Sequence, residues 1–338
     1  MSSIDGSAAT PSTVVLADVG VVVIGRNEGE RLKRCINSVQ SLAAHVVYVD
    51  SGSTDGSAEW ARSQGAEVID LDVTRPFTAA RARNAGFQRL RELAPGLPFV
   101  QFVDGDCEVV SGWLVAAHSF LHTRMQAAVA CGRRRERKPE ASIYNRLCDA
   151  EWNTPVGKAR SCGGDAMMRA DAFVAAEGYR DDLIAGEEPE LCVRLRAKGW
   201  EIWRIAPDMT LHDADITRFG QWWKRAQRGG HAFAEGAFLH GAPPERHGVV
   251  QAERALVWGV ALPLLMASMA LFNPLWLLLV LVYPVQMLRL AIRYGIREPA
   301  ERARAIFYVL GRFPEAQGVV QFWVNRLRRR RAALIEYK

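Results

Sequence analysis

The chain has 338 residues, of which 49% are hydrophobic and 24% charged, and a formal net charge of +6. This length can bury a large core and leaves room for two domains, or for one domain with an appendage. The six cysteines form no CxxC pair, which excludes a zinc site of paired cysteines and is typical of buried thiols in a reducing compartment. Residues 1–17 carry Asp5 and lack a signal peptide's cationic and apolar regions, so we expect a disordered lead.

Strands and helices are expected to alternate four times over the first third of the chain. Apolar runs predict strands at 19–24, 46–49, 66–71 and 99–103. Helical periodicity predicts helices at 28–40, 57–63, 78–93 and 113–125. Such alternation with short loops is typical of an α/β domain with a mainly parallel sheet and helices on both faces.

The pattern weakens after a further strand expected at 127–132. Residues 133–160 carry a basic run and Pro139 and Pro155, so this stretch is expected to be irregular, with a basic loop. A second α/β stretch follows it. Here we expect strands at 166–169 and 200–205 and helices at 170–177, 191–198 and 217–235.

Residues 255–288 contain no charged side chain. The run exceeds the roughly 20 residues of one membrane span and falls short of two. Asn273-Pro274 near its middle is a turn signal, so we expect two short apolar helices that span a membrane or re-enter one leaflet. The alternative is a buried hairpin in a soluble helical domain.

The C-terminal region 291–338 is basic and is expected to form amphipathic helices. Within it, residues 326–331 are all arginine except Leu327. Polybasic segments beside an apolar hairpin favour the cytoplasmic face and the anionic headgroups of membrane lipids. Because a hairpin returns both ends to one side, we expect the α/β domain at the cytoplasmic face of the inner membrane.

Asp104-Gly105-Asp106 follows the strand expected at 99–103. Two carboxylates at the carboxyl end of a parallel strand can hold a divalent cation, which prefers carboxylates together with phosphate oxygens. A solvated turn before a helix is the alternative.

Other polar residues follow the first two strands. Asp50 can accept hydrogen bonds from a base or ribose, or can form an Asx turn. Asn27 and Glu28 occupy the neighbouring loop or begin a helix. Arg83 can reach a phosphate, or belong with Arg81 to a solvated helix face.

The order of these motifs resembles the family 2 glycosyltransferases, which have the GT-A fold. The resemblance covers roughly residues 18–235. It rests on six segments in order: 21–28, 48–55, 82–86, 102–106, 163–165 and 186–194.

The resemblance implies a role for each matching residue. Donor contacts would be Asn27, Glu28, Asp50, Arg83 and Asp104. Asp106 would bind Mn²⁺ or Mg²⁺, and Gly163, Gly164, Asp165 and Glu187 would line the acceptor side. Glu188 would be the general base, although acidic residues beside Pro189 also suit the first turn of a helix.

Two further features extend this assignment. His212 is expected as a second metal ligand, with an ordinary structural histidine as the alternative. Residues 221–228 are similar to the Gln-x-x-Arg-Trp segment of polysaccharide synthases but lack its final tryptophan, which argues against processive synthesis. Arg225 or Arg228 is expected over the donor diphosphate, and Trp222 and Trp223 are expected to pack or to anchor at a membrane interface.

The resemblance therefore implies an inverting transfer from a nucleoside-diphosphate sugar to a glycan or a polyprenyl-linked acceptor in envelope or exopolysaccharide synthesis, without nucleic acid. A nucleotidyltransferase and a non-catalytic nucleotide-sugar-binding scaffold are the alternatives. An oxidoreductase is disfavoured because no GxGxxG follows the first strand. We expect a GT-A domain at 18–240, an apolar membrane hairpin at 255–290 and basic helices at 291–338.

Overall fold

The structure is a computed structural model that describes residues 15–329 and residue 335. Most of the expected disordered lead, residues 1–14, lies outside the described residues, as does the end of the arginine run. Leu16 and Ala17, which were assigned to the lead, belong to the first strand, β1 (Leu16–Gly25).

A nine-stranded mixed sheet forms the centre of the N-terminal part, in the order β3-β2-β1-β4-β8-β6-β9-β5, with β7 paired to β9. The first four strands of this order are parallel neighbours. They are β3 (Glu67–Asp70), β2 (Ala43–Asp50), β1 and β4 (Phe99–Asp104). The rest are β8 (Ala166–Arg169), β6 (Ala127–Glu136), β9 (Glu201–His212), β5 (Cys107–Val109) and β7 (Gly157–Ala159).

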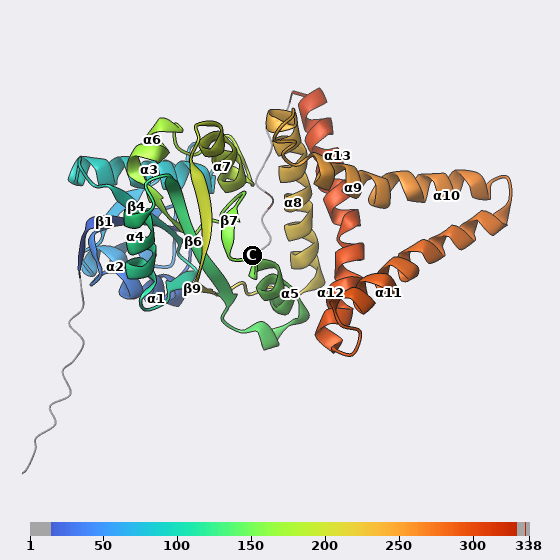
Figure 1. The fold of residues 1–338 in the computed structure, drawn as a ribbon, viewed down its shortest axis with the longest axis horizontal. Coiled ribbons are helices and arrows are strands. Elements are labelled where there is room, and N and C mark those ends of the chain that lie inside the picture. The colour runs from blue at the N-terminus through green and yellow to red at the C-terminus, as the bar shows by residue number, and fades with distance from the viewer. Residues whose placement is uncertain (1–14, 330–334, 336–338) are drawn as a thin grey trace, which may run out of the picture.

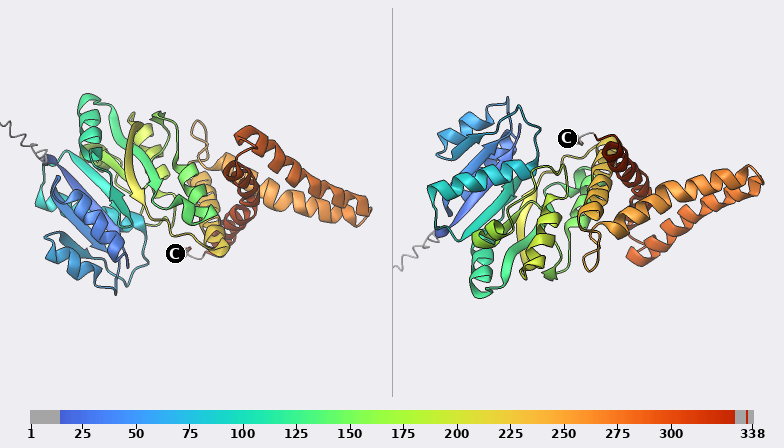
Figure 2. Two further views of the ribbon diagram at one scale, coloured as in Figure 1. Left: turned by 90° about the horizontal axis from the view of Figure 1, so that it is seen from below. Right: turned by 90° about the horizontal axis from the view of Figure 1, so that it is seen from above.

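Helices cover both faces of this sheet, as the sequence predicted. The opposite views of Figure 2 show α1 (Glu30–Val39) over one face and α3 (Ala79–Leu93) over the other. The remaining helices of this part are α2 (Ser57–Ser63), α4 (Trp113–Thr123), α5 (Ile143–Trp152), α6 (Ala170–Ala175) and α7 (Glu187–Ala197), with a 3-10 turn, η1, at Pro139–Ala141.

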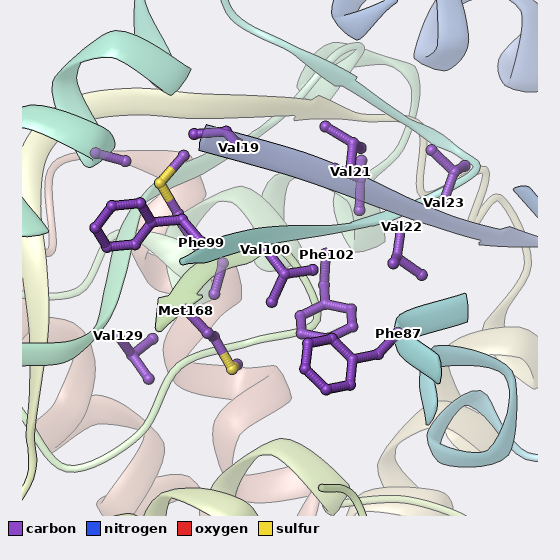
Figure 3. Packing of buried hydrophobic residues seen from close by; sticks show 14 of the residues in the cluster. Val19, Val21, Val22, Val23, Phe87, Phe99, Val100, Phe102, Val129 and Met168 are labelled. Carbon is purple, nitrogen blue, oxygen red and sulfur yellow. The ribbon is translucent and has the colours of Figure 1, made fainter. Parts of the chain in front are cut away.

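The valines of β1 explain why that strand reads as an unbroken apolar run. Val21, Val22 and Val23 are all fully buried, because helices cover both faces of the strand (Figure 3). Phe87 of α3 reaches Phe102 of β4, with ring centroids 6.4 Å apart. Burying one such side chain contributes about 1.5–3 kcal/mol.

The expectation of an irregular stretch at 133–160 was wrong. β6 continues to Glu136 beside β9, and α5 and β7 follow. Acidic partners neutralise the arginines of this strand: Arg133 pairs with Asp149, Arg134 with Asp165 and Arg135 with Asp208. β9 is likewise longer than expected, because it pairs with β6 as far as His212.

A helical part follows the sheet (Figure 1). Its long helix α8 (Phe219–His240) packs along α13 (Arg312–Leu327), and α12 (Pro299–Leu310) precedes α13. Between α8 and α12 in the chain, residues 249–294 form a pair of projecting helical arms, which we call the hairpin. Its arms are α9 (Val249–Leu256), η2 (Val257–Ala261) and α10 (Leu262–Ala270), then η3 (Pro274–Leu281) and α11 (Val282–Tyr294).

The hairpin points away from the sheet (Figures 1 and 2). By length and composition, both arms are long and apolar enough to cross a membrane. In the most apolar 18-residue stretch of each arm, only 17% is buried. Leu271 and Phe272 at the apex are 87% and 83% exposed. The expected turn at Asn273 is present, whereas the alternative of a buried hairpin does not fit these exposures.

Candidate active site

The carboxyl ends of three neighbouring strands bring the predicted residues to one edge of the sheet. Strand register places Gly25 beside Asp50 and Ile24 beside Asp104. The loops that leave β2, β1 and β4 therefore meet there, which is where ligands of open α/β sheets bind.

Asp50 is buried and is held by its own loop. The Tyr48 hydroxyl donates to it at 2.8 Å, and the backbone amides of Gly52 and Ser53 donate at 3.0 and 2.7 Å. This geometry is the Asx turn that the sequence left open. Asn27, in the left-handed region with φ 56°, accepts from the Thr54 amide at 2.8 Å and so ties the two loops together.

Arg83 is the centre of a buried charge cluster and not part of a solvated face. Its side chain is 3% exposed and lies 2.7 Å from Asp104, 3.0 Å from Glu187 and 3.1 Å from Glu188. Arg81, by contrast, is buried against its own loop and donates to the carbonyls of Arg75 and Pro76. The helix α3 thus sends one arginine to the site and uses the other to hold a loop.

A second buried arginine, Arg134, was not identified from the sequence. It pairs with Asp104 at 3.2 Å and with Asp165 at 2.9 Å. Asp165 is fully buried and also accepts from the Asp104 amide and the Thr210 hydroxyl. Successive side chains of a strand point to opposite faces, so Arg134 lies on the face opposite to Arg133 and Arg135. Assigning residues 133–136 to a strand would have revealed this difference from the sequence.

The two glycines before Asp165 differ in their surroundings. A Cβ on Gly164 would lie 2.3 Å from a guanidinium nitrogen of Arg83 and 2.7 Å from a carboxylate oxygen of Asp104. Only a glycine fits there while both charges keep their places. A Cβ on Gly163 would meet nothing within 4 Å, so that position faces open space.

Glu28 lies at the same edge. Its carboxylate pairs with Arg31 at 2.9 Å. Its side chain also lies against Gly105, whose added Cβ would come within 3.3 Å of the Glu28 Cγ. Glu28 therefore stands directly beside the turn that separates Asp104 from Asp106.

Asp106 and His212 are brought together at the ends of β4 and β9. Their side chains approach to 3.3 Å, and the other ring nitrogen of His212 lies 3.7 Å from Glu136. One carboxylate and one imidazole suit Mn²⁺ or Mg²⁺ at a site that phosphate oxygens complete. Cys107 Sγ is also within reach of these two side chains, and burial raises the pKa of its thiol well above its usual range.

The charges around this site are unbalanced. Arg83 and Arg134 face Asp104, Asp165, Glu187 and Glu188, and Asp106 lies beyond them. The excess of carboxylates is what a divalent cation would compensate, so the residues present fit such an ion.

Glu187 and Glu188 begin α7 after Gly186, whose φ of 81° only a glycine adopts readily. Burial and the neighbouring Glu187 raise the pKa of Glu188 to about 7, against the opposing effect of Arg83. The helix start and a chemical role are compatible, because the same turn that begins α7 aims Glu188 at Arg83.

Helix α8 borders the site through α5. Arg225 forms two hydrogen bonds with Glu151, at 2.9 and 3.1 Å, and the next residue, Trp152, packs against the His212 ring with centroids 4.8 Å apart. Arg228 lies three residues further along α8 and is half-buried. Trp222 packs on Tyr144 and Phe307, which confirms the expected packing role.

All six cysteines are buried, as expected.

Comparisons with known proteins agree with this architecture. Residues 20–170 match the model of glycosyl transferase family 2, a segment that includes Asp50, Asp106 and Asp165 and ends before Glu188 and His212. The succinoglycan biosynthesis protein ExoA of Rhizobium meliloti is 27% identical over 199 residues, which are 54% of this chain and 59% of that protein. Glycosyltransferase AglE of Haloferax volcanii is 31% identical over 110 residues, 30% of this chain and 34% of that protein. The matches thus span less than two thirds of these relatives.

Among solved structures, the mannosyltransferase PcManGT from Pyrobaculum calidifontis, in complex with GDP-Man and Mn²⁺, superposes with a TM-score of 0.61 at 18% identity. The superposition covers 91% of this chain and 88% of that one. At this identity the likeness establishes the GT-A fold, which includes the mixed sheet described above.

Proposed function

We propose that the chain transfers a sugar from a nucleoside-diphosphate sugar to a hydroxyl acceptor, with inversion at the anomeric carbon, as the match of residues 20–170 to the model of glycosyl transferase family 2 supports. The observation that carries this proposal is the position of Glu188. Its carboxylate has a pKa of about 7 and lies at the same buried cluster as Asp104, on the side of α7. A carboxylate with such a pKa is suited to accept a proton near neutral pH.

In this mechanism Glu188 removes the proton of the acceptor hydroxyl as its oxygen attacks the donor sugar. The bond from the anomeric carbon to the diphosphate breaks in the same displacement, so no covalent enzyme intermediate forms. Arg83 holds Glu188 and Asp104 in one arrangement, because it contacts both carboxylates. Preorganised charges of this kind need little rearrangement during the reaction.

The donor would lie across the edge formed by the loops after β1, β2 and β4. Asp50 and Glu28 would contact the nucleoside, with Asn27 fixing the loops, and Asp104 would face the sugar or ribose. Gly163, Gly164, Asp165 and Glu187 would border the acceptor. Arg225 and Arg228 are proposed near the diphosphate, and Arg225 would exchange its partner Glu151 for phosphate oxygens.

Asp106 and His212 would hold the Mn²⁺ or Mg²⁺. When bound, the cation would neutralise the charge that develops on the departing nucleoside diphosphate.

The hairpin is proposed to enter a membrane, with the catalytic domain at the cytoplasmic face. Its exposed apolar arms support this placement, and a polyprenyl-linked or glycan acceptor would suit an enzyme at that surface. On this proposal the chain divides into a GT-A domain at 18–240, a membrane hairpin at 255–290 and basic helices from 291 onward.

The test is release of nucleoside diphosphate when the full chain is incubated with UDP-, GDP- or dTDP-sugars, a metal ion and membranes. We expect release with one donor class, and its loss in Asp106→Ala. Calorimetric donor affinity that is unchanged by Mn²⁺, in the native chain and in Asp106→Ala alike, would refute the metal assignment. Pyrophosphate release from a nucleoside triphosphate would instead indicate a nucleotidyltransferase.

A further inference from the structure

A cavity of about 350 Å³ lies at the base of the hairpin, apart from the candidate active site. Four arginines line it: Arg254 of α9, Arg289 and Arg293 of α11, and Arg312 at the start of α13. Trp258 and Tyr308 are among the aromatic residues of its wall, and its lining residues include no aspartate or glutamate. The cavity therefore gathers positive charge from three helices that are distant in sequence.

Little of this charge is neutralised by the protein. Arg312 pairs with Glu315 at 2.7 Å, and its guanidinium lies 4.3 Å from the centre of the Tyr308 ring. Within residues 15–329 no ion pair is recorded for Arg254, Arg289 or Arg293, and all three are exposed. Like charges around one cavity repel one another, so an anion bound between them would be stabilising.

The position of the cavity along the hairpin indicates where that anion comes from. The uncharged run begins at Ala255, directly after Arg254, and ends at Leu288, directly before Arg289. Arg254 and Arg289 thus stand where the uncharged parts of the two arms end. If the arms lie in hydrocarbon, this level is that of the lipid headgroups, where tryptophan and tyrosine are also enriched.

We propose that this cavity binds the phosphate of an anionic phospholipid headgroup. Arg289 and Arg293 are four residues apart and share one face of α11, and Arg254 of the other arm lines the same cavity. A guanidinium donates two parallel hydrogen bonds to phosphate, and basic pockets between membrane helices on the cytoplasmic side bind such headgroups. The cationic group of a zwitterionic lipid would be repelled by the same arginines.

The proposal rests on membrane insertion of the hairpin and not on glycosyl transfer. A bound lipid would fix the depth of the catalytic domain above the bilayer. It would act close to the active site, because Phe307, the neighbour of Tyr308, packs on Tyr144 of α5, the helix that also carries Trp152.

The test uses the full chain in a neutral detergent, titrated with short-chain phosphatidylglycerol by calorimetry. We expect saturable binding, weakened at least tenfold in the double variant Arg289→Gln/Arg293→Gln. The control Arg297→Gln/Arg328→Gln removes the same charge from exposed positions outside the cavity and should bind within twofold of the native chain. Equal weakening in both double variants would overturn the proposal.

Two further ligands distinguish the source of the phosphate. Equal affinity for glycerol phosphate would refute a lipid site, and equal affinity for short-chain phosphatidylcholine would refute selection of an anionic headgroup. Flotation of the native chain with purely zwitterionic vesicles reports hairpin insertion separately. Flotation without phosphatidylglycerol binding would therefore contradict this site alone, and absence of flotation would contradict the membrane placement on which it rests.

Discussion

Opposing effects act on the protonation of the Glu188 carboxyl, and substitution of Glu188 tests its role as the base. Burial and Glu187 favour the protonated carboxyl, whereas Arg83 at 3.1 Å favours the carboxylate. Glutamine has the same shape but cannot take a proton, so Glu188→Gln should lower turnover by about 10²–10⁴ and leave donor affinity unchanged. Initial rates and donor calorimetry measure the two effects.

The matched control is Glu188→Asp, which keeps a carboxylate on a side chain one methylene shorter. It should retain far more turnover than Glu188→Gln. Equal loss in the two variants would mean that the position of the side chain, and not its proton transfer, sets the rate. A Glu188→Gln enzyme with most of its turnover would exclude Glu188 as the base.

The raised pKa of Glu188 also predicts how stability depends on pH. The carboxyl has an ordinary pKa of 4.5 and a pKa of about 7 in the folded protein, so the folded state binds the proton more tightly than the unfolded state. Its contribution to stability is complete below pH 4.5 and is lost as the pH rises through 7. Glu188→Gln should therefore unfold at a higher temperature than the native chain at pH 8, and this difference should shrink as the pH falls and vanish below pH 4.5. A difference that is independent of pH would contradict the raised pKa.

At the scale of elements, two glycines set how closely the helical part packs. A Cβ on Gly318 of α13 would lie 2.0 Å from the Gln227 carbonyl oxygen, and a Cβ on Gly230 of α8 would lie 2.0 Å from that of Glu315. Gly318→Ala should force α8 and α13 apart and lower the free energy of unfolding by about 1–3 kcal/mol. Denaturant titration followed by circular dichroism measures this loss.

Gly229→Ala is the control on α8, because a Cβ there meets nothing within 4 Å. It should stabilise the helix by about 0.5–1 kcal/mol, the usual gain of alanine over glycine in a helix. If both substitutions had the same effect, close approach of α8 and α13 would not be what Gly318 provides.

The same scale explains which elements could be predicted. The strands β1, β2 and β4 and the helices α1 and α3 follow from apolar runs and helical periodicity, because each buries apolar residues in a regular pattern. The C-terminal half of β6 could not be found this way, because its arginines are neutralised by residues distant in sequence. Asp165 directly precedes β8 and Asp208 lies in β9, and their pairing with Arg134 and Arg135 appears only in the folded chain.

The site shows the same division between local and non-local information. Asp50, Asp104 and Asp106 follow recognisable strands, so their shared edge was predictable from strand order. The place of His212 beside Asp106 depends on pairing between β5 and β9, and it was expected only from a resemblance. Arg134 had no local signal once its strand was taken as a loop.

For the whole molecule, the length of the hairpin decides how it meets a bilayer. The uncharged helical part has 16 residues in the first arm, 255–270, and 15 in the second, 274–288, which at ~1.5 Å per residue reach about 24 and 23 Å. The hydrocarbon core is about 30 Å thick. We therefore expect the hairpin to enter the bilayer without crossing it, with its apex still within hydrocarbon.

Charges at the apex test this expectation. Leu271 and Phe272 are largely exposed, so Leu271→Asp/Phe272→Asp should fold normally in detergent. Each aspartate costs about 2.5–3.5 kcal/mol deep in a bilayer, so the double variant should lose flotation with vesicles if the apex is immersed. A spanning hairpin would place the apex in water on the far side, and flotation would then persist. The control Leu93→Asp, an exposed leucine at the end of α3, should float like the native chain, because it lies on the sheet domain and not on the hairpin.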